Sequence, residues 1–239
     1  MRPRIGITTS VAPDTSTDGH PLQQQLDLRY VRAVEAAGGL PLPVPVLESD
    51  AAAADFAALL DGLVVIGGPA VERGMVGERP ADLNPTDPAR TASDERLLRL
   101  FLDDGDARPV LGICYGMQLL CALRGGRLWA DVEAQQPGVA VHSGGRGGKP
   151  HAVHTEPGSH AAALLGATFE SNTHHVQAVD AERPGDGLAV TGRAPDGVVE
   201  VVEGADGRLV GVQFHPERMG EVGAPLFRAL VERARQARA

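Results

Sequence analysis

A cysteine held between two glycines is the first feature of this sequence that could do chemistry. In PVLGICYGMQLL (109–120), an apolar run precedes Cys114 and an apolar helical pattern follows it. A strand, a tight turn and a helix in this order form the cysteine version of a nucleophile elbow, and Gly112 and Gly116 would prevent clashes in the turn. The helix N-terminus favours a thiolate and offers N–H groups to an oxyanion. We therefore predict that Cys114 is a nucleophile.

A thiol nucleophile needs a base, and GVQFHPE (211–217) offers one. An apolar strand delivers His215, and Glu217 two residues later would share its face of the strand and orient the imidazole. Each motif alone has an ordinary explanation, as a small buried cysteine in a glycine-rich turn or as a strand-end histidine beside a solvated glutamate. Both in one chain predict a Cys114–His215–Glu217 triad, because triads are defined by geometry and not by sequence order.

The elements around these motifs predict an α/β fold. Apolar, β-branched runs alternate with helical patterns in the first half of the chain, which indicates an open, mostly parallel central sheet with helices on both faces, as in flavodoxin-like folds. Shorter strands after about residue 127 indicate a small antiparallel section in the C-terminal half, before a closing helix. No linker divides the chain, so we expect one domain over residues 1–239. Helices are expected at 21–39, 51–60 and 91–102, and strands at 4–8, 40–46, 63–66 and 109–113.

Composition excludes several classes of partner. The 239 residues carry a formal net charge of −9, whereas nucleic acids and anionic membranes bind basic surfaces, so neither is expected. No apolar run reaches the length of a transmembrane helix, and the N-terminus lacks the apolar region of a secretory signal. Cys114 and Cys121 would lie roughly 10 Å apart on one helix, too far for a disulfide. Free thiols and the lack of a signal predict a cytoplasmic protein.

No metal or organic cofactor is predicted. The histidines other than His215 show no tight pairing with a nearby cysteine or carboxylate at a familiar ligand spacing, so they are expected at the surface or in a pocket. Gly67-Gly68-Pro69 after a strand lacks the other residues of a phosphate loop or a dinucleotide fingerprint. The charged residues of DERLLRLFLDDGDAR (94–108) are expected on a solvated helix face. The histidines weighed as ligands are His142, His151, His154, His160, His174 and His175.

The two motifs carry a family resemblance. GICYGMQ (112–118) with GVQFHPE (211–217) resembles the class I glutamine amidotransferase superfamily. Within it, the whole chain is similar to the gamma-glutamyl-gamma-aminobutyrate hydrolase group, a branch of the C26 peptidases. The matching segments are PRIGIT, AAGGLPLPVPV, LDGLVVIGGP, HAVHTEPGS, SNTHHVQAV and APDGVVEVVE.

The resemblance implies roles for individual residues. It gives Cys114, His215 and Glu217 the same triad roles as the motifs do. It also implies an oxyanion hole and contacts to a bound glutamyl group. The oxyanion hole would use the backbone N–H groups of Gly68 and Tyr115, and the substrate contacts would come from Gly67, Gln118 and His175.

Three positions depart from the pattern of the hydrolase branch. Tyr115 stands where that branch often has Arg, and Val176 replaces the second His of His-His-Gln. Soon after Gly-Gly, where that branch often has Asp, this chain has Pro69-Ala70-Val71. The departures leave the triad intact and concern the identity of the substrate.

The activity implied by the resemblance is cysteine-dependent hydrolysis of a gamma-glutamyl amine, of the gamma-glutamyl-GABA or gamma-glutamyl-polyamine type, through a thioester that releases glutamate. Two alternatives stay open: a glutaminase subunit supplying ammonia to a synthetase partner, which Tyr115 favours, and a binding protein without turnover. No motif defines the amine half of the substrate, which the 10–22 and 70–90 loops are expected to contact. A homodimer is the starting expectation for the oligomeric state.

Overall fold

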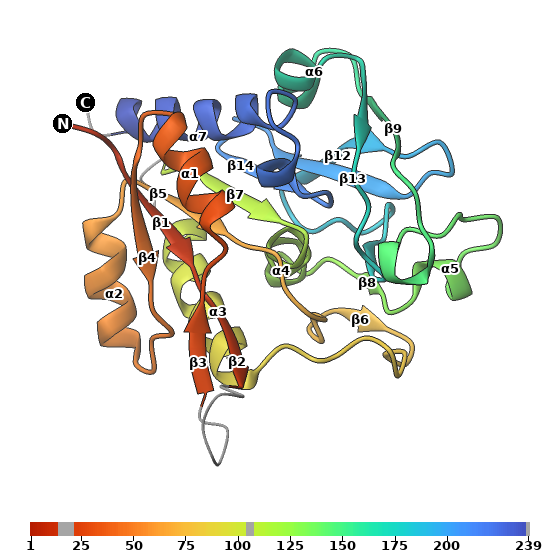
Figure 1. Ribbon diagram of the computed structural model, residues 1–239, viewed down its shortest axis with the longest axis horizontal. Coiled ribbons are helices and arrows are strands. Elements are labelled where there is room, and N and C mark those ends of the chain that lie inside the picture. Colours follow the sequence, from red (N-terminus) through yellow and green to blue (C-terminus); the bar gives the residue numbers. More distant parts are fainter. Residues whose placement is uncertain (14–21, 104–107, 238–239) are drawn as a thin grey trace.

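A large mixed sheet forms the centre of the molecule. The computed structural model describes residues 1–13, 22–103 and 108–237, and within these ranges the chain forms a nine-stranded sheet and two smaller ones. The large sheet is open, with strand order β10-β9-β12-β13-β14-β7-β5-β1-β4 (Figure 1). Its members are β1 (Arg4–Thr8), β4 (Leu40–Val44), β5 (Gly62–Val65), β7 (Val110–Ile113), β9 (His151–Thr155), β10 (Thr168–Ser171), β12 (Leu188–Arg193), β13 (Val199–Gly204) and β14 (Leu209–Val212).

The sheet divides into a parallel core and an antiparallel extension. Strands β4, β1, β5, β7 and β14 pair in parallel. Strands β13, β12, β9 and β10 continue the sheet in antiparallel pairs. The predicted α/β fold, with its parallel centre and its antiparallel section in the C-terminal half, is therefore confirmed.

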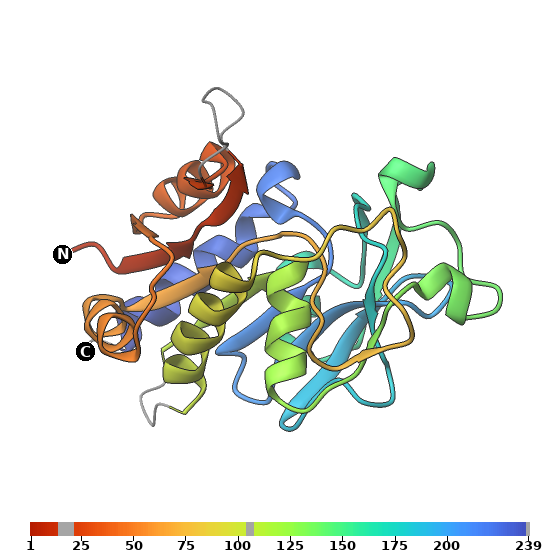
Figure 2. The ribbon, with the colours of Figure 1, turned by 90° about the horizontal axis from the view of Figure 1, so that it is seen from below.

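Helices cover both faces of the sheet. Helices α1 and α7 pack on one face, with α6 beside α7, whereas α2, α3 and α4 pack on the other (Figures 1 and 2). The helices are α1 (Leu28–Ala36), α2 (Asp50–Leu59), α3 (Pro88–Leu102), α4 (Tyr115–Leu123), α5 (Val132–Gln135), α6 (His160–Leu165) and α7 (Ala224–Gln236).

Two hydrophobic cores result from this layering. Every residue of β5 and β7 is buried, as expected for parallel strands covered on both faces. Alternate side chains point to opposite cores: Leu63 packs with α2, α3 and α4, whereas Val64 packs with α1 and α7. This double burial fixes the strand register, because a shift by one residue would exchange the two faces.

The helix predicted over residues 21–39 is wrong in its first part. Residues Leu22–Gln25 form β3, which pairs with β2 (Ser10–Pro13) in a two-stranded sheet. Helix α1 begins only after Asp27, whose side chain accepts a 2.9 Å hydrogen bond from the Arg29 N–H and caps the helix. The expected helices at 51–60 and 91–102 correspond to α2 and α3.

A third sheet lies beside the large one and is made of very short strands. It contains β6 (Met75–Val76), β8 (Leu128–Trp129) and β11 (Ala178–Val179). In this sheet β6, from the segment predicted as the 70–90 loop, pairs with β8, which follows α4. Within the described ranges, no helix is both long and apolar enough to cross a bilayer.

Candidate active site

Three neighbouring parallel strands bring the two motifs to one edge of the sheet. Strands β14, β7 and β5 are adjacent, and Val212 is in register with Ile113. The chain leaving β7 therefore meets the chain leaving β14 and β5 at their carboxyl ends, where open α/β sheets bind ligands. Cys114, His215 and the Gly67-Gly68 pair all lie just beyond these ends.

Cys114 adopts a strained backbone conformation. Its φ of 51° and ψ of −105° are unusual for a residue with a side chain, and it is the one non-glycine residue with positive φ in the described part of the chain. Such conformations cost about 1–3 kcal/mol and persist when the surroundings enforce them. Here β7 holds one side of the turn and α4 the other, so the sulfur is fixed at the helix N-terminus.

The flanking glycines are required by close backbone contacts. A Cβ on Gly116 would lie 2.1 Å from the Val65 carbonyl oxygen, and a Cβ on Gly112 would lie 2.7 Å from the Gly116 carbonyl. Helix α4 therefore starts in direct contact with β5 and β7. The predicted nucleophile-elbow geometry is present, for the steric reason that the sequence suggested.

His215 and Glu217 form a buried pair. The His215 Nδ1 lies 2.8 Å from the Glu217 Oε1, and both residues are less than a tenth exposed. Because a carboxylate accepts, Nδ1 carries the proton. The pair does not arise from two positions on one strand, as expected from the sequence, because Pro216–Arg218 form a 3₁₀ turn that brings Glu217 back to the ring.

Two further side chains hold the His215 residue in place. The Asn172 amide bonds its backbone in both directions, accepting from the His215 N–H at 2.9 Å and donating to the His215 carbonyl at 2.9 Å. The Tyr30 hydroxyl lies 3.4 Å from His215 Nδ1 and accepts from the Gly67 N–H at 3.2 Å. A Cβ on Gly67 would lie 2.6 Å from the ring, so this glycine makes room for the imidazole.

The imidazole is electrostatically coupled to the sulfur. Burial lowers the pKa of His215, but hydrogen bonding and charge from Cys114 and Glu217 outweigh it and raise this pKa to about 9. The structure thus favours an imidazolium at neutral pH.

The Gly67-Gly68 turn rests on a buried arginine that sequence analysis did not identify. Arg90 donates to the Ile66 and Gly67 carbonyls at 3.2 and 3.0 Å and pairs with Asp94 at 3.2 Å. Burial raises the pKa of Asp94 to about 6 even though Arg90 opposes the shift. The solvated-face prediction for residues 94–108 is wrong at Asp94, which is buried; residues 104–107 lie outside the described ranges.

The Tyr115 side chain does not face the site. It is fully buried, and the Arg90 guanidinium lies 4.4 Å from its ring centroid. Only its backbone can contribute to chemistry at Cys114. The side chain therefore belongs to the support beneath the Gly67-Gly68 turn.

A pocket of about 290 Å³ opens beside Cys114. It contains Gly68, Gln118 and His175, so three of the residues predicted from the resemblance lie around it. The Gln118 amide donates to the Gln177 carbonyl and to Gln213 Oε1, each at 3.1 Å, which fixes its orientation. The remaining lining residues are Pro69, Asp82, Leu83, Ser143, Gly145, Arg146, His174, Val176 and Gln177.

Two neighbouring histidines in the pocket wall differ in orientation. His174 stands edge-on to the His215 ring, with centroids 5.8 Å apart. Burial lowers the pKa of His174, and the charge of His215 adds to that effect. The His175 Nδ1 lies 3.0 Å from the Gln177 carbonyl oxygen, and its Nε2 lies 3.5 Å from a buried oxygen of Glu200. Both ring nitrogens of His175 are thus directed at protein groups.

Of the two loops expected to contact the amine half of the substrate, 70–90 is described in full and 10–22 only in part. Arg146 bonds Asp82 through Nε at 2.8 Å and Nη2 at 2.7 Å, which joins the 70–90 loop to the glycine-rich 144–149 segment at the pocket. Residues 14–21 of the other predicted loop lie outside the described ranges.

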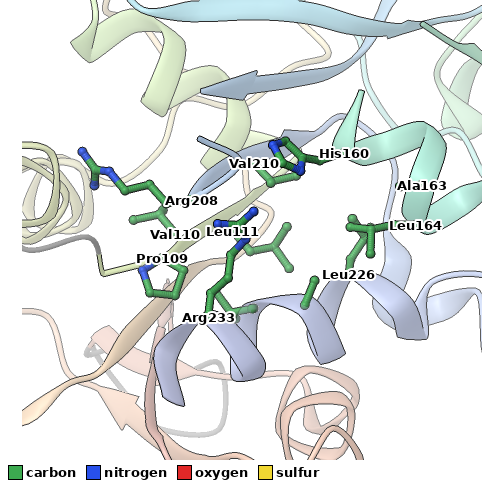
Figure 3. Close-up of a pocket in the computed structure, with 13 residues that line it drawn as sticks. Pro109, Val110, Leu111, His160, Ala163, Leu164, Arg208, Val210, Leu226 and Arg233 are labelled. Carbon is green, nitrogen blue, oxygen red and sulfur yellow. The ribbon is translucent and has the colours of Figure 1, made fainter. Parts of the chain in front are cut away.

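A second pocket lies at the opposite end of the parallel strands and has different chemistry. It has a volume of about 100 Å³ and is bounded by Pro109 at the start of β7, by α6 and by α7 (Figure 3). Its described lining is largely aliphatic, with His160, Arg208 and Arg233 as polar members and without a cysteine or carboxylate. Of these two pockets, the one beside Cys114 therefore brings together a thiol, imidazoles and a carboxylate.

The fold and the edge cysteine define the class of protein. The structure matches a Thermoplasma acidophilum crystal structure described as that of a GMP synthase subunit, with a TM-score of 0.68, 17% identity and coverage of 100% of this chain and 96% of that one. The fold is thus that of the class I glutamine amidotransferases. The family model for Peptidase C26 matches residues 3–217, and the chain belongs to that family.

Proteins with similar sequences have names consistent with this family. A Mycobacterium tuberculosis protein named as a glutamine amidotransferase is 32% identical over 98% of this chain and 75% of its own length. The gamma-glutamyl-gamma-aminobutyrate hydrolase of Escherichia coli strain K12 is 31% identical over 81% of this chain and 79% of its own. The predicted family resemblance is confirmed.

The contact between Gly116 and Val65 yields a stability prediction. Gly116→Ala should lower the free energy of unfolding by about 3 kcal/mol, the upper part of the overpacking range, because the obstructing atom is backbone. Gly145→Ala is the matched control: its nearest neighbour would be 3.6 Å away, so a change within about 0.5 kcal/mol is expected. Urea denaturation followed by circular dichroism measures both, and equal stabilities would contradict the steric argument.

The coupling between sulfur and imidazole yields a titration prediction. Cys114→Ala should lower the pKa of His215 from about 9, because one of the two groups that raise it is removed. NMR titration of the labelled imidazole measures the shift. Cys121→Ala is the control, since Cys121 packs in the core on the other face of the sheet and should leave the titration unchanged. An unaltered His215 pKa in Cys114→Ala would disprove the coupling.

Proposed function

We propose that this protein hydrolyses the gamma-glutamyl amide bond of a gamma-glutamyl amine. The observation that carries the proposal is the placement of Cys114 at a helix N-terminus, coupled to a buried His215–Glu217 pair. The chain belongs to the C26 family, and a gamma-glutamyl-gamma-aminobutyrate hydrolase is among its relatives. Both findings support hydrolysis of a gamma-glutamyl amide. The reaction needs no cofactor.

The proposed reaction has two halves that share one histidine. The Cys114 thiolate attacks the side-chain carbonyl carbon, and the C–N bond breaks as His215 gives its proton to the leaving amine. This leaves a gamma-glutamyl thioester. Water then attacks the thioester while His215 accepts the proton, and the C–S bond breaks to release glutamate and the thiolate. Glu217 keeps Nδ1 protonated and so aims the other ring nitrogen at the sulfur.

The oxyanion of each tetrahedral intermediate would be held by backbone N–H groups. The N–H of Tyr115 belongs to the first turn of α4, whose N–H groups have no partner within the helix. The N–H of Gly68 would be the second donor, held by the turn that Arg90 anchors. Loss of one such donor typically costs about 3 kcal/mol of barrier.

The pocket offers opposite charges to the amino-acid end of a glutamyl group. Arg146 could receive the α-carboxylate and Asp82 the α-ammonium, each replacing part of the Arg146–Asp82 pairing. Gln118 and His175 would form the wall along the glutamyl chain. The amine half would extend toward the 70–90 loop.

A glutaminase subunit would use the same triad. The presence of Tyr115 favoured that alternative. Its side chain, however, is buried against Arg90 and cannot contact a substrate or a partner. The stand-alone hydrolase in the cytoplasm is therefore the function we propose.

The proposal predicts the effect of removing each triad member. Cys114→Ala and His215→Ala should each lower kcat by at least about 10⁴-fold. Glu217→Gln should lower it by about 10²-fold or more, because the imidazole loses its orienting charge. Glutamate release from a panel of gamma-glutamyl amines measures this, with gamma-glutamyl-GABA, gamma-glutamyl-putrescine and glutamine included.

Cys121→Ala provides the matched cysteine control and should keep wild-type turnover. Iodoacetamide should modify Cys114 at neutral pH and leave Cys121 intact, because Cys121 is fully buried and burial raises the pKa of its thiol. Wild-type turnover in Cys114→Ala or His215→Ala would end the proposal. Turnover of glutamine alone, rising on addition of a synthetase, would favour the glutaminase alternative.

The charge pair at the pocket predicts a binding defect. Arg146→Ala should raise KM about tenfold or more with a smaller effect on kcat, since a charged hydrogen bond to the α-carboxylate is lost. Arg73→Ala, which removes an exposed arginine paired with Glu95 instead, should leave KM unchanged. A kcat loss without a KM change in Arg146→Ala would contradict α-carboxylate binding.

A further inference from the structure

A second cluster of ionisable side chains lies behind the wall of the Cys114 pocket. Glu200 on β13 is fully buried, and three histidines from separate segments surround it. The His151 Nε2 lies 2.9 Å from Glu200 Oε1, the His175 Nε2 lies 3.5 Å away and the His142 Nδ1 lies 3.6 Å away. His142 is only 1% exposed but lines a pocket, in line with the sequence-based expectation of a surface or pocket position.

The outer nitrogens of two of these rings are already committed as donors. The His142 Nε2 lies 2.9 Å from a carboxylate oxygen of Asp196, and the His175 Nδ1 lies 3.0 Å from the Gln177 carbonyl oxygen. Both partners only accept hydrogen bonds, so these nitrogens carry protons. In the neutral rings, the inner nitrogens therefore present lone pairs, and both lone pairs lie near the Glu200 carboxylate.

Such an arrangement requires positive charge at its centre, either a second proton on one of the rings or a bound cation. The His142 Nδ1, the His175 Nε2 and the Glu200 Oε2 are buried and have no hydrogen-bond partner among the described residues. Two lone pairs and a carboxylate repel one another in a low-dielectric interior, where an unpaired polar group costs about 1–3 kcal/mol. One divalent cation would pair with all three atoms at once.

The geometry fits a transition-metal ion with nitrogen and oxygen ligands. One ligand atom from each of His142, His175 and Glu200 lies within 4.8 Å of the others. Ligands at the usual zinc bond lengths of about 2.0–2.2 Å are separated by roughly 3.4 Å in a tetrahedron, so small side-chain movements close the site. Asp196 and the Gln177 carbonyl then act as the outer partners that orient metal-bound histidines.

We propose that His142, His175 and Glu200 bind one Zn²⁺ ion, with His151 orienting the Glu200 carboxylate. A pocket of about 390 Å³ lined by His142, His151 and Asp196 gives the ion a route from solvent. The site shares His175 with the wall of the Cys114 pocket but supplies no reacting group to the hydrolysis. Its role is to cross-link β13, the segment around His142 and the 172–177 segment, whose Asn172 holds the His215 backbone.

The experiment measures zinc binding directly. The full-length Cys114→Ser protein is used throughout, because a thiol beside His215 could itself bind zinc. After chelator treatment, incubation with ZnCl₂ and gel filtration, the protein should retain one equivalent of zinc by elemental analysis. Competition with a chromophoric chelator gives the Kd, and zinc should raise the Tm in a concentration-dependent manner.

Variants distinguish this site from adventitious binding. Glu200→Gln and His142→Ala should weaken zinc binding by about 100-fold or more, and Asp196→Asn by about 10–100-fold as an outer partner. His154→Ala is the matched control, since this exposed histidine on β9 bonds Thr168 instead and should not alter the Kd.

Circular dichroism checks that each variant is folded, and Asp196→Asn tests the site even if a ligand variant unfolds. Zinc retained equally by the parent, Glu200→Gln and Asp196→Asn overturns the proposal, as does failure of the parent to retain zinc. Neither result depends on hydrolysis, so the zinc site and the proposed activity stand or fall separately.

Discussion

The backbone strain at Cys114 is the constraint on which the rest of the site depends. A positive φ at a residue with a side chain is unfavourable by about 1–3 kcal/mol, and here it is imposed by the packing of α4 against β5 and β7. The contact is possible because Gly112 and Gly116 lack Cβ atoms. The buried parallel strands thus supply the energy that holds the buried Cys114 at the wall of the pocket.

The partner of the sulfur is held by a different means. His215 lies beyond the end of β14, so no ladder hydrogen bond positions it, and side chains from distant segments take over that task. Asn172 fixes its backbone, Glu217 fixes its ring and Tyr30 joins the ring to the Gly67 N–H. Strain therefore positions the Cys114 sulfur, whereas a hydrogen-bond network positions the imidazole.

Sequence reasoning reached the parts of this site that depend on local chemistry. The elbow was predictable because its glycines and cysteine are close in the chain, and the alternation of strands and helices predicted the parallel sheet that carries it. Arg90 and Asp94 were beyond its reach, because a charged pair four residues apart on a helix usually faces solvent. Here the pair is buried, and its partner is the Ile66–Gly67 backbone. The LQQQ strand was missed because Leu22 and Leu26 match a helical period, while the pairing of β3 with β2 depends on residues distant in sequence.

The 172–177 segment connects the two polar centres of the molecule. Asn172 at one end bonds the backbone of His215, and His175 near the other end faces Glu200 in the sheet extension. A segment with little regular structure needs such side-chain anchors, since its backbone has few ladder partners. Strand β13 directly neighbours β14, and through this segment its Glu200 side chain is connected to the backbone of His215 beyond the carboxyl end of β14.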